Sequence, residues 1–354
     1  MIAKFSPLCF AVALTACSTG YPPQVYTACE RDPVGNFLIK WESFYSMVGK
    51  VDIYISGDPN NFDLRRPPVL SANVEDCVAT YVTPDNISRQ YFRLIFENGQ
   101  AYTVGERPIK MDSVPNLRDI GGYFASGGGT TRWGMVYRSG SLGHLSLRDS
   151  LRLANLHLRT IIDMRSATEM ASSPLFFANA RIVRLPLTIN TLSTASDGLR
   201  TDRLRRGDAT IHMQDAYLRF VSENTPAFSA ALREFLIRDN YPILVTCTFG
   251  KDACGFFSSL LLAALGIPES TILDDYLETG LTFEHIIPHL GFSPGTLSAG
   301  AIDAALVLLS ADESFLTPIH DRVRKDYGSF ESFLSGEFGL SPSDRTHLKN
   351  ILLR

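Results

Sequence analysis

No apolar run in this 354-residue chain approaches the ~20 residues that a membrane-spanning helix requires, so no transmembrane helix is expected. A basic excess is also missing, because 33 Lys and Arg residues are outnumbered by 37 Asp and Glu residues. The net charge of −4 argues against a nucleic-acid partner, which would need a basic face. The 7 histidines lack metal-ligand spacing, and Gly250-Lys251 lacks the preceding glycine of a nucleotide-binding loop. We therefore expect no metal and no cofactor.

The first residues have the pattern of a short secretory signal. Lys4 precedes an apolar stretch from Phe5 to Leu14, and the sequence Leu-Thr-Ala-Cys ends at Cys17. This ending resembles the cleavage site of bacterial lipoproteins, which implies a signal peptide over residues 1–16 and a lipid on Cys17. The chain would then be exported and anchored in the envelope, on the periplasmic side of the outer membrane if the host has two membranes. An ordinary cleaved signal is the alternative.

The region that follows predicts a tether and then a β-rich domain. Residues 17–28 include Gly and Pro residues typical of a flexible tether. In residues 29–110, apolar side chains recur at every second position in short runs separated by turn residues, and Asn98-Gly99 is a hairpin signal. This pattern predicts a small antiparallel sandwich and resembles fibronectin-type modules. Strands are predicted at residues 37–41, 51–55, 78–82, 91–96 and 101–104.

From residue 111 to residue 354 the pattern changes to strands that alternate with helices. Such alternation predicts an α/β domain with a central sheet and flanking helices. Buried strands are predicted at residues 159–164, 182–187 and 241–245, and helices at residues 147–156, 225–238 and 256–265.

The most informative segment follows the last of these strands and runs from Thr246 to Gly255; we call it the cysteine loop. Its position between a buried strand and an apolar helix brings Cys247 to the backbone amides of a helix N-terminus. Unpaired N–H groups and the positive end of the helix dipole favour a bound anion and lower the pKa of a thiol. The cysteine loop therefore predicts a phosphate-binding site with its own nucleophile.

The cysteine loop resembles the signature His-Cys-x-x-Gly-Lys-Asp-Arg-Thr-Gly of bacterial tyrosine-phosphatase-like proteins, which are atypical cysteine-dependent protein-tyrosine or dual-specificity phosphatases. Thr246 replaces the His of this signature, Ala253 the Arg and Cys254 the Thr. The matching residues are Cys247, Gly250, Lys251, Asp252 and Gly255. Four further segments resemble the family in its order, namely residues 116–123, 136–140, 161–166 and 272–276. The resemblance implies a phosphatase-type central sheet with flanking helices over residues 111–354.

The resemblance also implies roles for the residues of the cysteine loop. Cys247 would attack phosphorus as a thiolate, and Asp252 would be the general acid, although an Asp at this place also suits a helix N-cap. Lys251 would place a positive charge beside the anion, without the two-point grip that the missing arginine provides. Substrate-binding groups are expected at Thr248, Phe249, Gly250, Lys251, Ala253, Cys254 and Gly255.

Two residues outside the cysteine loop are further candidates for substrate binding. Arg118 and Asp119 belong to a segment that, by resemblance, lies close to the active site. Arg118 could approach the phosphate from outside the loop. Equally, Arg118 and Asp119 could form a structural ion pair that supports Gly121-Gly122.

The cysteines leave two possible disulfides open. Cys29 and Cys77 lie in the same N-terminal segment and could pair in an oxidising compartment, or remain two unpaired thiols. Cys254 lies seven residues beyond the nucleophile and could join Cys247 under oxidation, or pack as an inert thiol in the helix.

Taken together, these patterns predict a lipid-anchored phosphatase of reduced activity. The substrate class would be a phosphorylated protein, with phosphotyrosine or phosphoserine, or a phosphoinositide. The main alternative is a catalytically inactive pseudophosphatase that binds phosphate or a partner through the same loop, which Ala253 favours. A third possibility is a structural envelope lipoprotein whose β-sandwich is the binding element.

Overall fold

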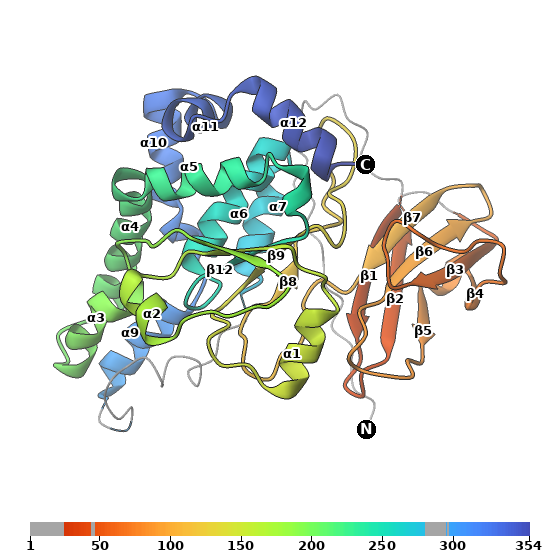
Figure 1. The fold of residues 1–354 in the computed structure, drawn as a ribbon, viewed down its shortest axis with the longest axis horizontal. Helices are drawn as coiled ribbons and strands as arrows, with labels where there is room; N and C mark the ends of the chain where they lie inside the picture. The colour runs from red at the N-terminus through yellow and green to blue at the C-terminus, as the bar shows by residue number, and fades with distance from the viewer. Residues whose placement is uncertain (1–24, 44–46, 280–294, 296) are drawn as a thin grey trace.

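A computed structural model describes residues 25–43, 47–279, 295 and 297–354 of the chain. The predicted signal peptide and Cys17 lie outside the described residues. A β-sandwich, drawn in red and orange, precedes a larger α/β part, drawn from yellow to blue (Figure 1). This is the fold class that the sequence predicts.

The sandwich consists of a three-stranded sheet of order β1-β2-β5 and a four-stranded sheet of order β4-β3-β6-β7, with a short 3-10 helix, η1 (Val74–Asp76), between β4 and β5. All neighbouring strands are antiparallel, as the sequence pattern predicts. The predicted hairpin joins β6 to β7 at Asn98-Gly99. Strands β1 and β4 were not predicted. The bounds are β1 (Val25–Arg31), β2 (Phe37–Ser43), β3 (Lys50–Ser56), β4 (Leu70–Asn73), β5 (Val78–Tyr81), β6 (Tyr91–Phe96) and β7 (Ala101–Gly105).

The disulfide between Cys29 and Cys77 is not formed; both residues are free thiols. Cys29 is paired with Ile39 of β2, and the other neighbour of Ile39 is Ala79 of β5. Strand β2 therefore lies between Cys29 and the segment that contains Cys77. Two steps between strands of ~4.8 Å each exceed the Cα separation that a disulfide tolerates.

The α/β part contains a five-stranded sheet of order β11-β10-β12-β9-β8. Four strands are parallel, and only the edge strand β8 is antiparallel to its neighbour. The strands are β8 (Arg118–Asp119), β9 (Val136–Ser139), β10 (Thr160–Asp163), β11 (Arg181–Arg184) and β12 (Ile243–Thr246).

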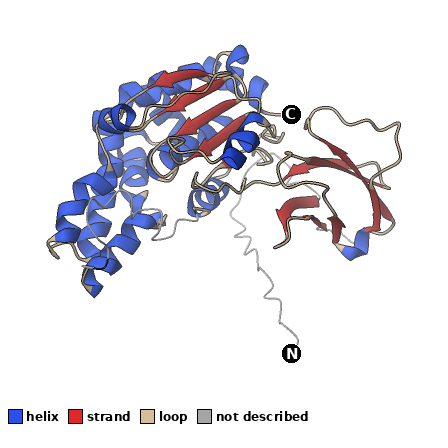
Figure 2. Cartoon of the chain, turned by 60° about the horizontal axis from the view of Figure 1, so that its bottom comes forward, coloured by secondary structure: helices blue, strands red, loops and turns tan. Residues whose placement is uncertain are grey.

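Both faces of this sheet are buried, as its apolar strands require. Successive side chains of a strand point to opposite faces, so Ile161 packs with the α1 side while Ile162 packs with the larger helical side. Figure 2 shows helices on both sides of the sheet. The helices are α1 (Leu147–Ala154), α2 (Ala167–Ser172), α3 (Thr191–Arg200), α4 (Arg206–Glu223), α5 (Thr225–Glu234), α6 (Asp252–Leu265), α7 (Glu269–Leu277), α9 (Ala299–Leu309), α10 (Thr317–Arg322), α11 (Phe330–Phe338) and α12 (Pro342–Leu352), with shorter turns η2 (Arg238–Asn240), η4 (Glu313–Phe315) and η5 (Val323–Tyr327). Within the described residues, no helix combines the length and apolarity needed to cross a membrane.

Buried polar contacts connect the sandwich to the α/β part. Arg89, which precedes β6, forms an ion pair with Asp119 of β8 at 3.2 Å, and both side chains are almost completely buried. The Trp133 indole donates to the Thr103 carbonyl of β7 at 3.0 Å. Trp133 also packs in the hydrophobic core of the sandwich. The predicted boundary at residues 110 and 111 thus falls in the connection between β7 and β8, but side chains from both parts share one interior.

Candidate active site

The cysteine loop begins at the carboxyl end of β12, where ligands bind in open α/β sheets. The helix that follows, α6, begins at Asp252, four residues before the predicted start at Phe256. Acidic residues stabilise the first turn of a helix, which accounts for the earlier start. The amides of Asp252, Ala253 and Cys254 therefore belong to the first turn of α6 and have no acceptor inside the helix.

Side chains outside the loop hold its carbonyl groups. The Asn116 amide donates to the Phe249 carbonyl at 3.1 Å. The Arg138 guanidinium donates to the Gly250 carbonyl at 2.8 Å and to the Lys251 carbonyl at 3.2 Å. Because three successive carbonyls are held by donors around the loop, the intervening N–H groups are free to turn toward its interior. This arrangement supports the predicted anion site.

Arg138 belongs to a buried charge cluster beneath the loop. Asp275 of α7 accepts from Arg138 at 2.8 Å and from Arg118 at 3.3 Å, and all three side chains are buried. Burial raises the pKa of Asp275, but Arg118, Arg138 and Arg107 and the Tyr123 hydroxyl outweigh it and lower the pKa to about 2. Two guanidinium groups against one carboxylate leave an excess positive charge under the anion site.

Neither Arg138 nor Asp275 was assigned a role from the sequence. Both lie in segments that resemble the phosphatase family, residues 136–140 and 272–276. Their position in these segments was the available signal. It could not show that the two side chains meet, because 137 residues separate them in the chain.

The sulfur of Cys247 lies inside the loop. Burial raises the pKa of the Cys247 thiol, but hydrogen bonds from the Cys254 thiol and amide and from the Gly250 amide outweigh it, so the pKa is below its ordinary value. Arg138 is close enough to interact electrostatically with this sulfur. Cys247 therefore loses its proton more readily than an ordinary cysteine, which suits a nucleophile.

One substitution and one glycine shape the start of the loop. The Thr246 hydroxyl, at the position of the signature histidine, donates to the Gly140 carbonyl at 2.7 Å and so fixes the end of β12 to the segment after β9. Gly250 has a φ of +68°, and a Cβ there would lie 2.5 Å from the Gly140 nitrogen and the Ser139 carbonyl carbon. Gly250 is thus required both by its left-handed conformation and by the close approach of another backbone segment.

Replacing Gly250 with alanine is expected to distort the loop and abolish anion binding. The matched control is Gly99→Ala in the β6–β7 hairpin, where φ is +86° and a Cβ would meet nothing within 4 Å. Gly99→Ala should therefore lower the free energy of unfolding only by the cost of placing alanine in the left-handed conformation, ~1–2 kcal/mol. Urea unfolding should show a clearly larger loss of stability for Gly250→Ala. Equal losses in the two variants would contradict the contact of Gly250 with residues 139–140.

Lys251 and Asp252 form a buried pair within the cysteine loop. The Lys251 ammonium group donates to the Asp252 carboxylate and lies 5.8 Å from the centre of the Phe315 ring. Asp252 also accepts from the Thr191 hydroxyl at 2.9 Å and the Tyr217 hydroxyl at 3.1 Å. The carboxylate thus accepts from three donors, whereas a general acid must donate. Its catalytic role stays a prediction, and the charge of Lys251 is largely compensated by Asp252.

Thr248, Ala253 and Gly255 were also predicted to bind substrate, and each has its own surroundings in the structure. The Thr248 hydroxyl donates to Glu169 of α2 at 2.6 Å, and Ala253 is almost fully buried in the first turn of α6. The Gly255 amide donates to the Lys251 carbonyl at 2.8 Å within the helix, so it does not face an anion. A Cβ at Gly255 would lie 2.9 Å from the Arg138 guanidinium, so this glycine makes room for Arg138.

Arg118 and Asp119 do not form the pair that the sequence suggested. The side chains of neighbouring residues in a strand point to opposite sides. Arg118 pairs with Asp275 and donates to Asn116 at 3.1 Å, so it supports the loop from behind. Asp119 pairs with Arg89 and accepts from the amides of Gly121 and Gly134, at the junction with the sandwich. Neither side chain is directed at the interior of the cysteine loop by these contacts.

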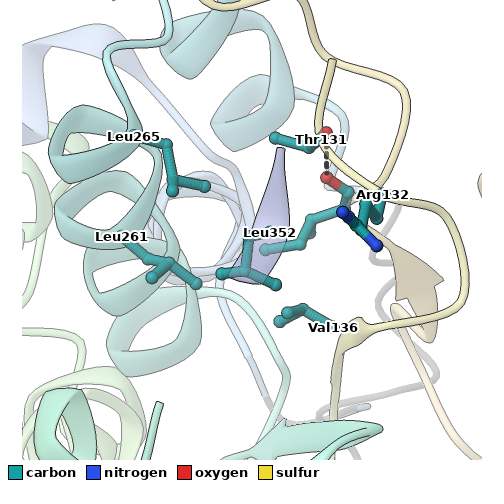
Figure 3. Close-up of a pocket in the computed structure, with 7 residues that line it drawn as sticks. Thr131, Arg132, Val136, Leu261, Leu265 and Leu352 are labelled. Atoms are coloured by element: carbon teal, nitrogen blue, oxygen red, sulfur yellow. Dashed lines mark hydrogen bonds between the residues drawn. The ribbon is translucent and has the colours of Figure 1, made fainter. Parts of the chain in front are cut away.

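Among the described residues, cavities are also found outside the cysteine loop. A cavity of about 10 Å³ lies between α6 and the C-terminal residues. Val136, Leu261 and Leu352 are among the residues that line it (Figure 3). Its volume is close to that of a single water site. A surface cleft of about 410 Å³ between α1 and the segment before β11 is lined in part by His157 and Phe176. Within the described residues, no group of three or more His, Cys, Asp or Glu side chains could hold a metal ion.

Residues 109–354 match the tyrosine phosphatase family, and the chain therefore belongs to this family. The matched region contains the whole α/β sheet and the cysteine loop.

The relatives differ in how much of each chain is shared. A Cupriavidus necator protein, whose name assigns it provisionally to the tyrosine-protein phosphatases, is 34% identical over 180 residues; the match covers 49% of this chain and 64% of the relative. The triple specificity protein phosphatase PtpB of Mycobacterium tuberculosis is 22% identical over 280 residues, covering 67% of this chain and 96% of that protein. The catalytic core of the PP-IP phosphatase Siw14 from S. cerevisiae is a solved structure with 14% identity and a TM-score of 0.25, covering 52% of this chain and 86% of that one. A TM-score of 0.25 is too low to support any conclusion about the fold of this chain.

Proposed function

We propose that this chain is a cysteine-dependent phosphatase of slow turnover that hydrolyses phosphate monoesters of proteins or phosphoinositides through a phosphocysteine on Cys247. The observation that carries this proposal is the hydrogen bonding of the Cys247 sulfur, which accepts from amides of the loop and has a lowered pKa. A stabilised thiolate beside convergent N–H groups suits attack on a phosphoryl group.

The reaction would proceed in two displacements. The thiolate attacks phosphorus, so the S–P bond forms while the ester P–O bond breaks and the leaving oxygen takes a proton from water. Water then attacks phosphorus, the S–P bond breaks, and inorganic phosphate leaves the regenerated thiolate. Loop amides and the N-terminus of α6 would hold the phosphoryl oxygens, and the excess charge of Arg118 and Arg138 would stabilise them from behind.

Slow turnover follows from Ala253. The signature arginine grips two phosphoryl oxygens at once, and an alanine offers no donor. Removal of one preorganised donor commonly lowers the rate by ~10²- to 10³-fold. Lys251 is a poor substitute, because its ammonium group is engaged by Asp252.

The second candidate is a pseudophosphatase that binds phosphate or a phosphorylated partner without turnover. Ala253 and the paired Lys251 favour it, since both reduce transition-state stabilisation more than they reduce the amide contacts to a ground-state anion.

Cys247→Ser separates the two candidates. If the chain is an enzyme, its slow release of phosphate from p-nitrophenyl phosphate and phosphotyrosyl peptides should fall to background in this variant, while inorganic phosphate still protects the variant against thermal unfolding. Acid quenching of the native chain with a ³²P-labelled substrate should trap label on the peptide that contains Cys247. Turnover that survives Cys247→Ser would rule out the phosphocysteine route. Phosphate binding with no turnover in the native chain would favour the pseudophosphatase.

We also propose export and lipid anchoring through Cys17. This rests on the sequence of residues 1–17 alone. In a bacterial host, membrane fractionation of the native chain and Cys17→Ser tests it, because only the native chain should sediment with membranes and incorporate labelled fatty acid.

A further inference from the structure

Asn116, which precedes β8, contacts the backbone in the middle of the cysteine loop. Its side-chain amide donates to the Phe249 carbonyl at 3.1 Å. The Gly140 amide donates to the Pro115 carbonyl at 2.7 Å, and Gly140 also pairs with Phe249 in an isolated bridge. Asn116 itself has a φ of 60°, a left-handed conformation that asparagine adopts more readily than most residues. Its side chain is therefore held beside the loop by its own backbone.

Arg118 determines which end of the Asn116 amide faces the loop. A guanidinium group has donors only, so its contact with the Asn116 side chain at 3.1 Å is made to the amide oxygen. The NH₂ end must then face the Phe249 carbonyl. Arg118 is held in turn by Asp275, through the carboxylate at 3.3 Å and the backbone carbonyl at 2.6 Å. The buried charge cluster thus directs the donor that reaches the loop.

The peptide group between Phe249 and Gly250 takes its direction from Asn116. In a trans peptide the C=O and N–H bonds point in opposite directions. Because Asn116 holds the carbonyl, the Gly250 N–H points to the other side, where it interacts with the Cys247 sulfur. Within the part of the chain that the structure describes, no backbone carbonyl accepts from this N–H. It is therefore available to a phosphoryl oxygen beside that sulfur.

Gly250 alone does not maintain this orientation. A flip of the peptide plane would change ψ of Phe249 and φ of Gly250, and would take φ of Gly250 from +68° to a negative value. Glycine populates both signs of φ about equally, so the flip meets little resistance at this residue. The flipped peptide would direct the Phe249 carbonyl oxygen at the anion and repel it. The hydrogen bond from Asn116 favours the orientation that binds.

We propose that Asn116 is a positioning residue of the anion site, whose hydrogen bond to the Phe249 carbonyl keeps the Gly250 N–H directed at the phosphoryl group. The binding role rests on the proposed function, because it requires that the loop takes up a phosphoryl group, whereas the orientation of the peptide does not. This amide carries a larger share of the anion binding here than in the family signature, since Ala253 supplies no side-chain donor.

Asn116→Gly and Asn116→Asp test this role in the full chain. Glycine keeps the left-handed backbone and removes the amide, whereas aspartate keeps the oxygen that accepts from Arg118 but places a second oxygen against the Phe249 carbonyl. By isothermal titration, both variants should bind inorganic phosphate about 10-fold more weakly, the effect of losing one hydrogen bond. Asn155→Asp is the matched control, because the Asn155 amide donates to the Leu151 carbonyl at 3.1 Å on α1, outside the loop. Its phosphate affinity should equal that of the native chain.

The pH dependence of Cys247 alkylation separates positioning from a general loss of stability. The Gly250 amide is one of the groups that lower the pKa of the Cys247 thiol. Its reorientation in the Asn116 variants should therefore raise the pH midpoint of alkylation by iodoacetamide, while Asn155→Asp leaves the midpoint unchanged. The tryptic peptide of residues 239–251 contains Cys247 as its only cysteine, so mass spectrometry can follow this thiol alone.

A folded Asn116 variant with the native alkylation midpoint would overturn the proposal, as would one that binds phosphate as tightly as the native chain. If the native chain binds no phosphate, the proposed function fails, and the alkylation midpoint alone then decides whether Asn116 orients the Gly250 amide. The native chain also gives a readout that needs no variant. Bound phosphate should shift the NMR resonance of the Gly250 amide, and a resonance that does not respond would contradict the proposed contact.

Discussion

Ala253→Arg is expected to raise the turnover of p-nitrophenyl phosphate by at least ~100-fold. The reason is that the loop already supplies a cysteine of lowered pKa and first-turn amides that have no acceptor inside α6, but no bidentate donor for the transition state. Ala253 lies in that first turn, at the position of the signature arginine, so the substitution restores the guanidinium where the family signature has it. The gain should appear mainly in kcat, because a clamp that grips hardest in the transition state adds less to ground-state binding.

Three variants test the cause of this gain. Ala253→Lys restores the positive charge without the planar guanidinium group, and Ala253→Gln restores a long side chain without the charge. Both variants should therefore raise turnover much less than Ala253→Arg does. Cys247→Ser combined with Ala253→Arg should be inactive. An Ala253→Arg variant that folds, binds phosphate and remains inert would show that the site lacks more than its arginine, with the engaged Asp252 carboxylate as the next candidate.

Asp275→Asn is expected to lower the free energy of unfolding by ~3–5 kcal/mol, the usual cost of breaking a buried ion pair. Asp275 lies between Arg118 and Arg138, and its removal leaves two buried guanidinium groups without their shared counter-ion. Because Arg138 also holds the carbonyls of Gly250 and Lys251, phosphate binding should weaken as well. Asp274→Asn is the matched control, since Asp274 precedes Asp275 on α7 but is exposed. Urea titration of both variants gives the comparison.

Acid titration provides an independent check on Asp275. Its pKa is about 2 in the folded chain against an ordinary value of 3.8, so the unfolded chain binds the proton more readily. The stability contributed by this depressed pKa is fully present above pH ~4 and is lost as the pH falls toward ~2. The difference in unfolding free energy between the native chain and Asp275→Asn should therefore shrink over this range. A difference that stays constant from pH 5 to pH 2 would contradict the assignment of the low pKa to Asp275.

The sequence predicted the parts of the site that depend on neighbouring residues. A strand, a cysteine and an apolar helix in direct succession define the loop around Cys247 locally, and the sandwich strands follow from their alternation. The support of the loop could not be predicted, because Arg138 and Asp275 meet only in the folded chain. The same limit applies to Cys29 and Cys77: their common segment suggested a pair, but the intervening strand β2 appears only in the sheet order. The sequence analysis also named no helix at α3 and α4.

The two residues of β8 have a consequence for how this chain can be divided. Arg118 belongs to the charge cluster behind the cysteine loop, while Asp119, its direct neighbour, takes its counter-ion from the sandwich. A fragment beginning at residue 111 would retain the Asp119 carboxylate in an apolar interior without Arg89, and Trp133 without the Thr103 carbonyl. The sandwich is accordingly not an exchangeable adaptor. Side chains of the sandwich supply the partners that buried groups of the α/β part need. Strand β8 joins the two functions, because Asp119 binds the sandwich and Arg118 supports the cysteine loop.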